Sequence, residues 1–368
     1  MAYRAKILHI VVLGIIGVTI VFYSSYSTGP VFLYHIKSNF QRKLHENTTN
    51  GTSEMAASKH LTLHGPTQVT LSVTHETLIN KTKMEENHVL DKTTQGITTE
   101  AIYESGYDIP NADLCPELGK RLKVVVGIMS APSHKDARMA IRQTWGHYAL
   151  RQDVSLAFIV GTSKEVQLNS ITSEESTIYG DIIRGNFIDS YDNLTLKTIS
   201  FMEWVDNYCS SSPFVLKTDD DMFINFPKLL SFIEKHWKSE NTIFGRLARK
   251  WKPIRNKRSK YYVSVKQFSQ PVFPDFNTGP AYLLTGDIIN RLYKNALKST
   301  YLKLEDVFTT GIVAQSLNIK RVHINEFINK RIPFNICNIK KSISIHMVKF
   351  HEQFDLWKKL LDGRSKCK

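Results

Sequence analysis

Three consecutive carboxylates in this sequence could do chemistry together. Asp219, Asp220 and Asp221 follow the apolar run Phe214-Val-Leu216, which is typical of a buried strand. Adjacent anions repel one another and resist burial, and a divalent cation with oxygen ligands would relieve the repulsion. The pattern therefore predicts a metal–diphosphate site, although an acidic turn in solvent would look similar. The apolar residues on both sides of the aspartates favour the site.

A second acidic group, Glu305 and Asp306, comes at the start of an expected helix. Acids in the first turn of a helix commonly stabilise it, because they face the positive end of its dipole. A carboxylate beside another carboxylate would also suit a general base, since the neighbour raises its pKa. Spacing alone leaves both interpretations open.

Two arginines and one histidine are further candidates. Arg138 and Arg142 are four residues apart, so they share one face of an expected helix. They could contact an anion at the end of the preceding strand, or they could be solvated surface residues. His346 lies in the apolar stretch 343–348, where a histidine is more often a core residue than a metal ligand.

Strands that alternate with helices must position these residues, and this order predicts an α/β domain with a largely parallel sheet. Such sheets bind ligands beyond the carboxyl ends of their strands. Strands are expected at 122–129, 154–160, 181–187 and 214–216, and within 276–284, where a Gly-Pro turn leads into an apolar strand. Helices are expected at 134–148, 163–179, 192–208, 226–237 and 287–297, and from 305 onward.

The chain is strongly basic, with 368 residues and a formal net charge of +14. This charge suits anionic partners, such as nucleotide phosphates, acidic glycans or membrane surfaces. No nucleic-acid-binding module is visible, so we expect no nucleic-acid partner. Residues 246–266 contain nine basic residues and no acidic one. That stretch could be a solvated loop, or it could dock an acidic acceptor or a membrane surface.

The N-terminal part predicts a membrane anchor. Residues 7–23 are mostly apolar, and the two cations that precede them place a short tail, 1–6, on the cytoplasmic side. A cleaved signal peptide is the alternative, but no convincing cleavage site follows, which favours an uncleaved signal anchor. Residues 24–111 are polar and predict a flexible stem, and residues 112–368 predict the folded lumenal domain.

Glycosylation sequons agree with a lumenal location. They begin at Asn47, Asn50, Asn80 and Asn193. The four cysteines do not have zinc-site spacing, and they would lie in a compartment where disulfides form. Four cysteines allow three pairings, and the sequence does not choose among them.

Four ordered segments resemble the motifs of the β-1,3-glycosyltransferase family, which includes β-1,3-galactosyltransferases and β-1,3-N-acetylglucosaminyltransferases. They are Ala137–Gly146, Asp192–Thr198, Lys217–Phe223 and Glu305–Val307. The resemblance extends from about residue 115 to the C-terminus and does not cover the stem. It implies a GT-A fold, in which a Rossmann-like nucleotide-binding half joins an acceptor-binding half, together with a UDP-sugar donor and Mn²⁺.

The resemblance also implies roles for the candidate residues. Asp221 and His346 resemble the family's metal ligands, and Asp306 resembles its catalytic base. The other four candidates are implied to lie near the nucleotide: Asp219, Asp220, Arg138 and Arg142.

The implied activity is an inverting UDP-sugar-dependent β-1,3-hexosyl transfer. We expect galactose to pass from UDP-galactose to a glycan of a glycoprotein or glycolipid. The enzyme would be a single-pass type II protein of the Golgi membrane. Transfer of N-acetylglucosamine or N-acetylgalactosamine is the alternative within the class. An inactive glycan-binding relative is the alternative outside it.

Overall fold

The computed structural model describes residues 96–364 and residue 367. Apart from Thr177–Gly180, all of these belong to one compact unit. The expected tail, the expected anchor and most of the expected stem lie outside the described residues, so these assignments stay predictions. Within the described part of the chain, no helix combines the length and apolar character that crossing a membrane requires.

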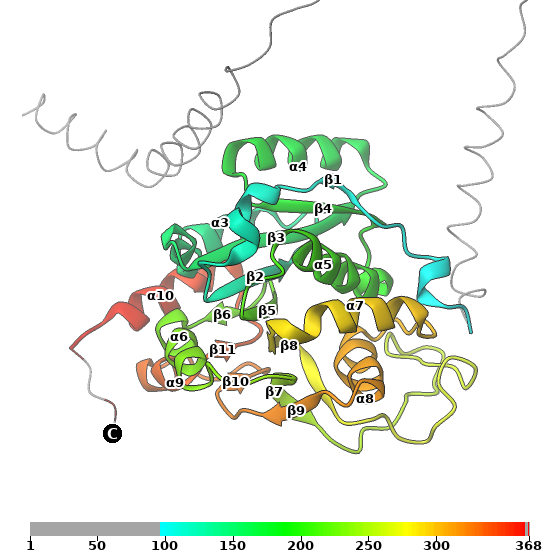
Figure 1. Cartoon of the computed structure of the whole chain (residues 1–368). Helices are drawn as coiled ribbons and strands as arrows, with labels where there is room; N and C mark the ends of the chain where they lie inside the picture. The colour runs from blue at the N-terminus through cyan, green and yellow to red at the C-terminus, as the bar shows by residue number, and fades with distance from the viewer. Residues whose placement is uncertain (1–95, 365–366, 368) are drawn as a thin grey trace, which may run out of the picture. The chain divides into compact units, whose positions relative to one another are not determined.

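A mixed sheet of eight strands runs through the compact unit in the order β1-β4-β3-β2-β5-β8-β7-β9 (Figure 1). Strands β4, β3, β2 and β5 are parallel, whereas β8 is antiparallel to both β5 and β7. The strands are β1 Tyr107–Ile109, β2 Val124–Met129, β3 Val154–Thr162, β4 Ile182–Ile188, β5 Phe214–Asp219, β7 Thr242–Ala248, β8 Phe276–Thr285 and β9 Lys320–His323. The predicted α/β class is confirmed.

A second, smaller sheet has the order β10-β11-β6. Its strands are β6 Phe223–Ile224, β10 Phe327–Ile328 and β11 Ser344–Ile345. Strand β6 follows β5 after only three residues, so the two sheets meet at the consecutive aspartates.

Helices cover both faces of the large sheet. The helices of the described residues are α3 Lys135–Arg142, α4 Val166–Tyr179, α5 Leu194–Tyr208, α6 Phe226–Lys235, α7 Ile289–Lys298, α8 Ala314–Ser316, α9 Ile336–Lys341 and α10 Gln353–Leu361. The π-helix η7, Val307–Val313, leads directly into α8. One apolar core packs α5, α7 and η7 against the sheet, and a second core packs α3, α6 and α10 against the opposite face.

The sequence of β2 explains how one strand contributes side chains to both cores. Val124, Val126 and Ile128 join the core of α3 and α6, and Val125 faces the core of α5. Alternating side chains point to opposite faces of a sheet, so a run of apolar residues is what a strand covered on both sides requires. Gly127 lies under α5, where an added Cβ would stand 2.4 Å from a ring carbon of Phe201.

The helix predicted at 134–148 is shorter than expected. Helix α3 ends at Arg142, and residues Trp145–Leu150 form a 3₁₀ helix. Between them Thr144 has a non-helical backbone, with φ −127° and ψ −118°. The chain there passes close to α3. A Cβ added to Gly146 would lie only 2.5 Å from the carbonyl oxygen of Ile141, which shows how close this approach is. A continuous helix would not allow this approach.

The Gly-Pro turn predicted within 276–284 is wrong, because Gly279 and Pro280 lie inside the continuous strand β8. Proline cannot donate to a strand ladder and therefore needs an interruption. The pairing of β7 with β8 supplies one, since its register shifts between Gly245 and Leu247. In the connection from β7 to β8, a single bridge joins Ile254 to Tyr262.

Two disulfides link the first and last segments of the domain to helices. Cys115 is bonded to Cys209 at the end of α5, and Cys337 in α9 is bonded to Cys367 near the C-terminus. All four cysteines are therefore paired, a pairing that the sequence had left open. Ordered structure also begins before residue 112, because β1 pairs with β4.

Candidate active site

The consecutive aspartates lie where β5 ends, next to the end of β2. Asp220 accepts a hydrogen bond of 2.7 Å from the hydroxyl of Ser130, the residue after β2. The Oδ2 atom of Asp220 also lies 2.9 Å from Nδ1 of His134. This hydrogen bond raises the pKa of His134, so the imidazole carries positive charge more readily beside the acids. The predicted repulsion between the carboxylates is therefore reduced by protein groups around Asp220.

Lys217 connects the two acidic groups. Its Nζ lies 2.7 Å from Oδ1 of Asp219 and 3.5 Å from Oε2 of Glu305. The same ammonium group donates to the carbonyl oxygen of Gly279 at 2.7 Å. Burial acts to lower the pKa of Lys217, but the charges of Asp219 and Glu305 outweigh it and raise that pKa. The fold thus places one buried positive charge between acids that are distant in sequence.

Asp306 lies at the start of η7 and is held by two backbone groups. Its Oδ1 accepts from the N–H of Val307 at 2.9 Å, and its Oδ2 accepts from the N–H of Gly279 at 2.9 Å. Burial raises the pKa of Asp306, against the lowering effect of these hydrogen bonds and of Lys217. The prediction of acids at a helix start is confirmed for Asp306, and two backbone N–H groups fix the orientation of its carboxylate.

Asp221 and His346 are brought together by the small sheet. Strand β11 pairs antiparallel with β6, with Ile345 opposite Phe223, so the residue after β11 meets the residues before β6. Nε2 of His346 lies 3.2 Å from Oδ2 of Asp221, whose side chain is 48% exposed. The sequence had favoured a core histidine, whereas the structure places this imidazole beside a carboxylate.

The Asp221–His346 pair suits one kind of metal site. Among residues 96–364 and 367, no group of three or more histidine, cysteine or acidic residues could enclose a metal ion. A pair that offers one carboxylate oxygen and one imidazole nitrogen fits a cation that takes its other ligands from substrate phosphates and water. The pair could therefore supply two protein ligands to a divalent cation, and Mn²⁺ binding stays a prediction.

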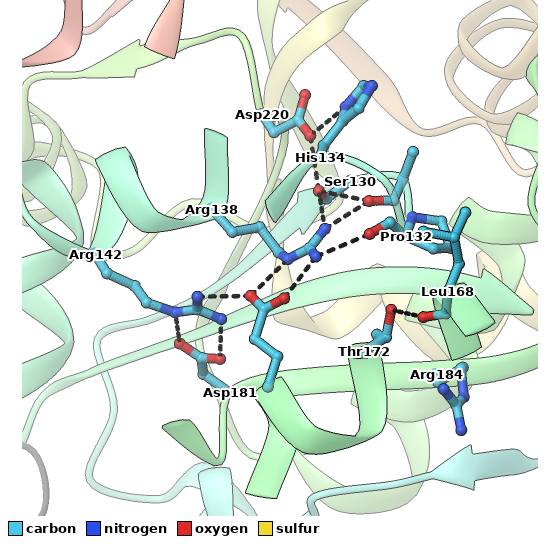
Figure 2. A network of polar contacts seen from close by, with 12 residues as sticks. Ser130, Pro132, His134, Arg138, Arg142, Leu168, Thr172, Asp181, Arg184 and Asp220 are labelled. Atoms are coloured by element: carbon cyan, nitrogen blue, oxygen red, sulfur yellow. Dashed lines mark hydrogen bonds and ion pairs between the residues drawn. The ribbon is translucent and has the colours of Figure 1, made fainter. Parts of the chain in front are cut away.

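Arg138 and Arg142 form a buried network beneath the acidic group (Figure 2). The side chain of Arg138 has no exposed area, and it donates to Glu175 at 2.8 and 2.7 Å and to Ser130 at 3.1 Å. Two backbone carbonyls after β2 accept its remaining hydrogen bonds. Arg142 donates to Glu175 at 2.6 Å and to Asp181 twice at 2.8 Å.

The solvated alternative for the two arginines is therefore wrong, because carboxylates from distant segments bury them. The structure also does not place either guanidinium directly among the predicted site acids. Arg138 reaches Asp220 through the hydroxyl of Ser130, which accepts from the arginine and donates to the aspartate. Direct contact of Arg138 or Arg142 with a nucleotide stays a prediction.

Sequence reasoning missed several residues of this site. Ser130 and His134 surround the turn after β2, and Glu175 lies near the end of α4. A sequence signal did exist for Lys217, because a lysine inside an apolar strand, two residues before an aspartate, requires a counter-ion. No comparable signal marks Glu175, which resembles any acid of a polar helix.

Comparison with known proteins identifies the family of the chain. A family model described as galactosyltransferase matches residues 136–325, a segment that contains both acidic groups and both arginines. The chain therefore belongs to the galactosyltransferase family, and the predicted membership of the β-1,3-glycosyltransferases is confirmed.

Individual relatives carry the same family name. The chain is 34% identical over 245 residues to human beta-1,3-galactosyltransferase 5, covering 65% of this chain and 79% of the relative. It is 33% identical over 235 residues to mouse beta-1,3-galactosyltransferase 1, covering 62% and 72%. Among solved structures, it is similar to galactosyltransferase LgtC with a TM-score of 0.34 and 8% identity, covering 65% of this chain and 96% of that one.

Proposed function

We propose that the protein is an inverting glycosyltransferase of the GT-A type that transfers galactose from UDP-galactose to a 3-hydroxyl of a glycan acceptor. The observation that carries the proposal is the position of Gly279. Its carbonyl oxygen accepts from Lys217 and its N–H donates to Asp306, so one residue of β8 joins the acidic group at β5 to the acid at η7. A donor held at one group and a base at the other could meet on this strand.

In the proposed reaction, Asp306 removes the proton from the acceptor hydroxyl as that oxygen attacks the anomeric carbon of galactose. The bond from this carbon to the UDP oxygen breaks, and the anomeric centre inverts in a single displacement. The backbone groups of Gly279 and Val307 hold the carboxylate in one orientation. Because the carboxylate already has one orientation, less conformational entropy is lost when the base and the acceptor hydroxyl align for reaction.

The proposal includes a divalent cation and a nucleotide position. Asp221 and His346 would hold Mn²⁺, which would supply neutralisation of negative charge on the diphosphate. Asp220, fixed by Ser130 and His134, and Asp219, fixed by Lys217, would line the nucleotide position. We further propose that the chain is a type II protein of the Golgi membrane that acts on protein- or lipid-linked glycans.

The first test uses the full-length chain in detergent with Mn²⁺ and a panel of UDP-sugars. Transfer from UDP-galactose to a terminal N-acetylglucosamine or galactose acceptor is the expected result. Asp221→Asn should raise the Mn²⁺ concentration that gives half-maximal activity by about 10- to 100-fold, because it removes a carboxylate ligand. Transfer from UDP-N-acetylglucosamine instead would support the proposed reaction class and contradict the proposed donor.

The matched control is Asp113→Asn, which makes the same chemical change at an exposed residue of the same domain. It should leave the Mn²⁺ dependence unchanged. An Asp221→Asn variant with an unaltered Mn²⁺ dependence would show that the cation, if required, binds elsewhere.

The buried lysine gives a prediction about pH. Asp306 must be deprotonated to act as a base, so activity is lost as pH falls through its pKa. The charge of Lys217 lowers that pKa. Lys217→Met should therefore move the acid limb of kcat/KM to higher pH, whereas Lys217→Arg should keep it in place. The pH–rate profiles of the two variants measure this, and an unmoved limb in Lys217→Met would contradict the assignment of the base.

A further inference from the structure

The end of β7 and the connection from β7 to β8 carry an excess of positive charge that ion pairs within the described part of the chain do not neutralise. Of the nine basic residues at 246–266, Arg255 donates to backbone carbonyls of the same connection, and Arg249 lies 3.6 Å from a carboxylate oxygen of Asp275. The others are exposed and have no ion pair with any residue that the structure describes. They are Arg246, Lys250, Lys252, Lys257, Arg258, Lys260 and Lys266.

Lys260 differs from the other cations because it lies against two aromatic rings. Its Nζ is 5.3 Å from the ring centre of Tyr191 and 4.8 Å from that of Tyr261. Both rings remain accessible, since Tyr191 is 47% exposed and Tyr261 is 44% exposed. Two half-exposed aromatic rings around one ammonium group that has no ion pair with the described residues form a surface that could bind a ring and an anion together.

This surface lies beside the segment that carries the proposed base. The carbonyl oxygen of Asp192 accepts from the hydroxyl of Tyr301 at 2.6 Å, and its side chain pairs with Lys303 at 2.9 Å. These bonds hold Tyr191 next to the short segment that leads into Asp306. Burial first, then the neighbouring hydroxyl of Tyr261, and then the charges of Asp306 and Asp192 raise the pKa of Tyr191, which agrees with this proximity.

We propose that Tyr191, Lys260 and Tyr261 form an acceptor subsite for a sugar that carries a carboxylate or a sulfate ester. The inference rests on the proposed function, because it assigns the acceptor class of that reaction. The sugar ring would pack on the tyrosine faces, and its anion would meet Lys260. The remaining cations of the connection would attract the acidic acceptor from solution.

An anionic membrane is the competing partner for this connection. Trp251 and Val265 are also exposed, at 57% and 62%, and such side chains could enter a lipid surface. The position of Lys260 beside the two rings and the base segment favours the sugar. A membrane contact would not require a cation between aromatic faces near the reacting groups.

The direct test measures binding to the full-length chain without donor. The probes are a disaccharide that ends in N-acetylglucosamine and the same disaccharide with one sulfate ester. Saturation-transfer NMR detects the binding of each probe, and titration measures its affinity. We expect the sulfated probe to bind about fivefold more tightly at low salt, and Lys260→Gln to remove this difference. Lys257→Gln is the matched control, because it removes an equal charge without a ring contact.

Kinetics with a constant donor concentration give the second measurement. Lys260→Gln should raise KM for the sulfated acceptor about fivefold and leave KM for the neutral acceptor unchanged, with kcat preserved. Lys260→Arg should keep the wild-type preference. Tyr261→Ala should raise KM for both acceptors, because it removes the ring face and not the charge.

The outcomes separate the subsite from the reaction. Equal binding of both probes, or equal effects of Lys260→Gln and Lys257→Gln, would overturn the subsite. A tryptophan emission shift on phosphatidylserine vesicles that Trp251→Phe abolishes, without selective binding of the sulfated probe, would assign the connection to a membrane and also overturn it. Selective binding without any sugar transfer would keep the subsite and reject the proposed function.

Discussion

Asp306→Asn is expected to lower kcat by about 10²- to 10⁴-fold, the contribution of a positioned general base. The amide cannot take the acceptor proton, and the neighbouring Glu305 does not readily replace Asp306, because it is buried and accepts from the hydroxyl of Tyr282. Sugar transfer from UDP-galactose measures the loss, and calorimetric titration of UDP with Mn²⁺ measures whether donor binding survives.

The substitution should change the fold little. Asparagine keeps one carbonyl oxygen, so it can accept from Val307 or Gly279 but not from both, and we expect a loss of about 1 kcal/mol in stability. Asp113→Asn again serves as the exposed control. If Asp306→Asn retained kcat within tenfold of the wild type, the base would have to be another group.

The largest effect on stability is expected from Glu175→Gln. The carboxylate of Glu175 accepts from both Arg138 and Arg142, and all three side chains are almost completely buried. Removing its charge leaves the guanidinium of Arg138 with neutral partners only, while Arg142 keeps Asp181. Breaking a buried ion pair from one side typically costs about 3–5 kcal/mol. Chemical denaturation of the two proteins measures the difference.

Glu174→Gln provides a closely matched control, because it is the adjacent residue on the same helix and is exposed. It should change stability by less than about 0.5 kcal/mol. The effect of Glu175 should also depend on pH. Burial acts to raise its pKa, but the two arginines outweigh this and lower it. Its stabilising contribution is therefore present above the ordinary carboxyl pKa and is lost as pH falls through the lowered folded-state value. Equal stability of both variants would contradict this account.

Much of the fold was predictable, because it depends on local patterns. The apolar runs at 122–129 and 214–216 predicted two buried strands, and the structure pairs these strands in parallel. The three aspartates also had a local signal, since acids that directly follow such a strand lie at its carboxyl end.

The network of arginines was not predictable from the same kind of pattern. Two arginines four residues apart are typical of a solvated helix face, and their partners lie 37 and 39 positions further along the chain. Likewise, nothing near His346 in the sequence indicates that β11 pairs with β6 and brings the imidazole to Asp221. These contacts depend on long-range pairing, which single-sequence periodicity does not contain.

The antiparallel strand β8 has a consequence for how such an enzyme can diverge. The pairing of Ala248 with Phe276 closes the base of the basic connection, while Gly279, further along β8, fixes the spacing of Lys217 and Asp306. The connection can therefore change in length and charge without altering the alignment of the reacting groups. Acceptor preference can therefore change while the catalytic rate stays the same. Exchanging this connection between two relatives should transfer the acceptor preference and preserve kcat.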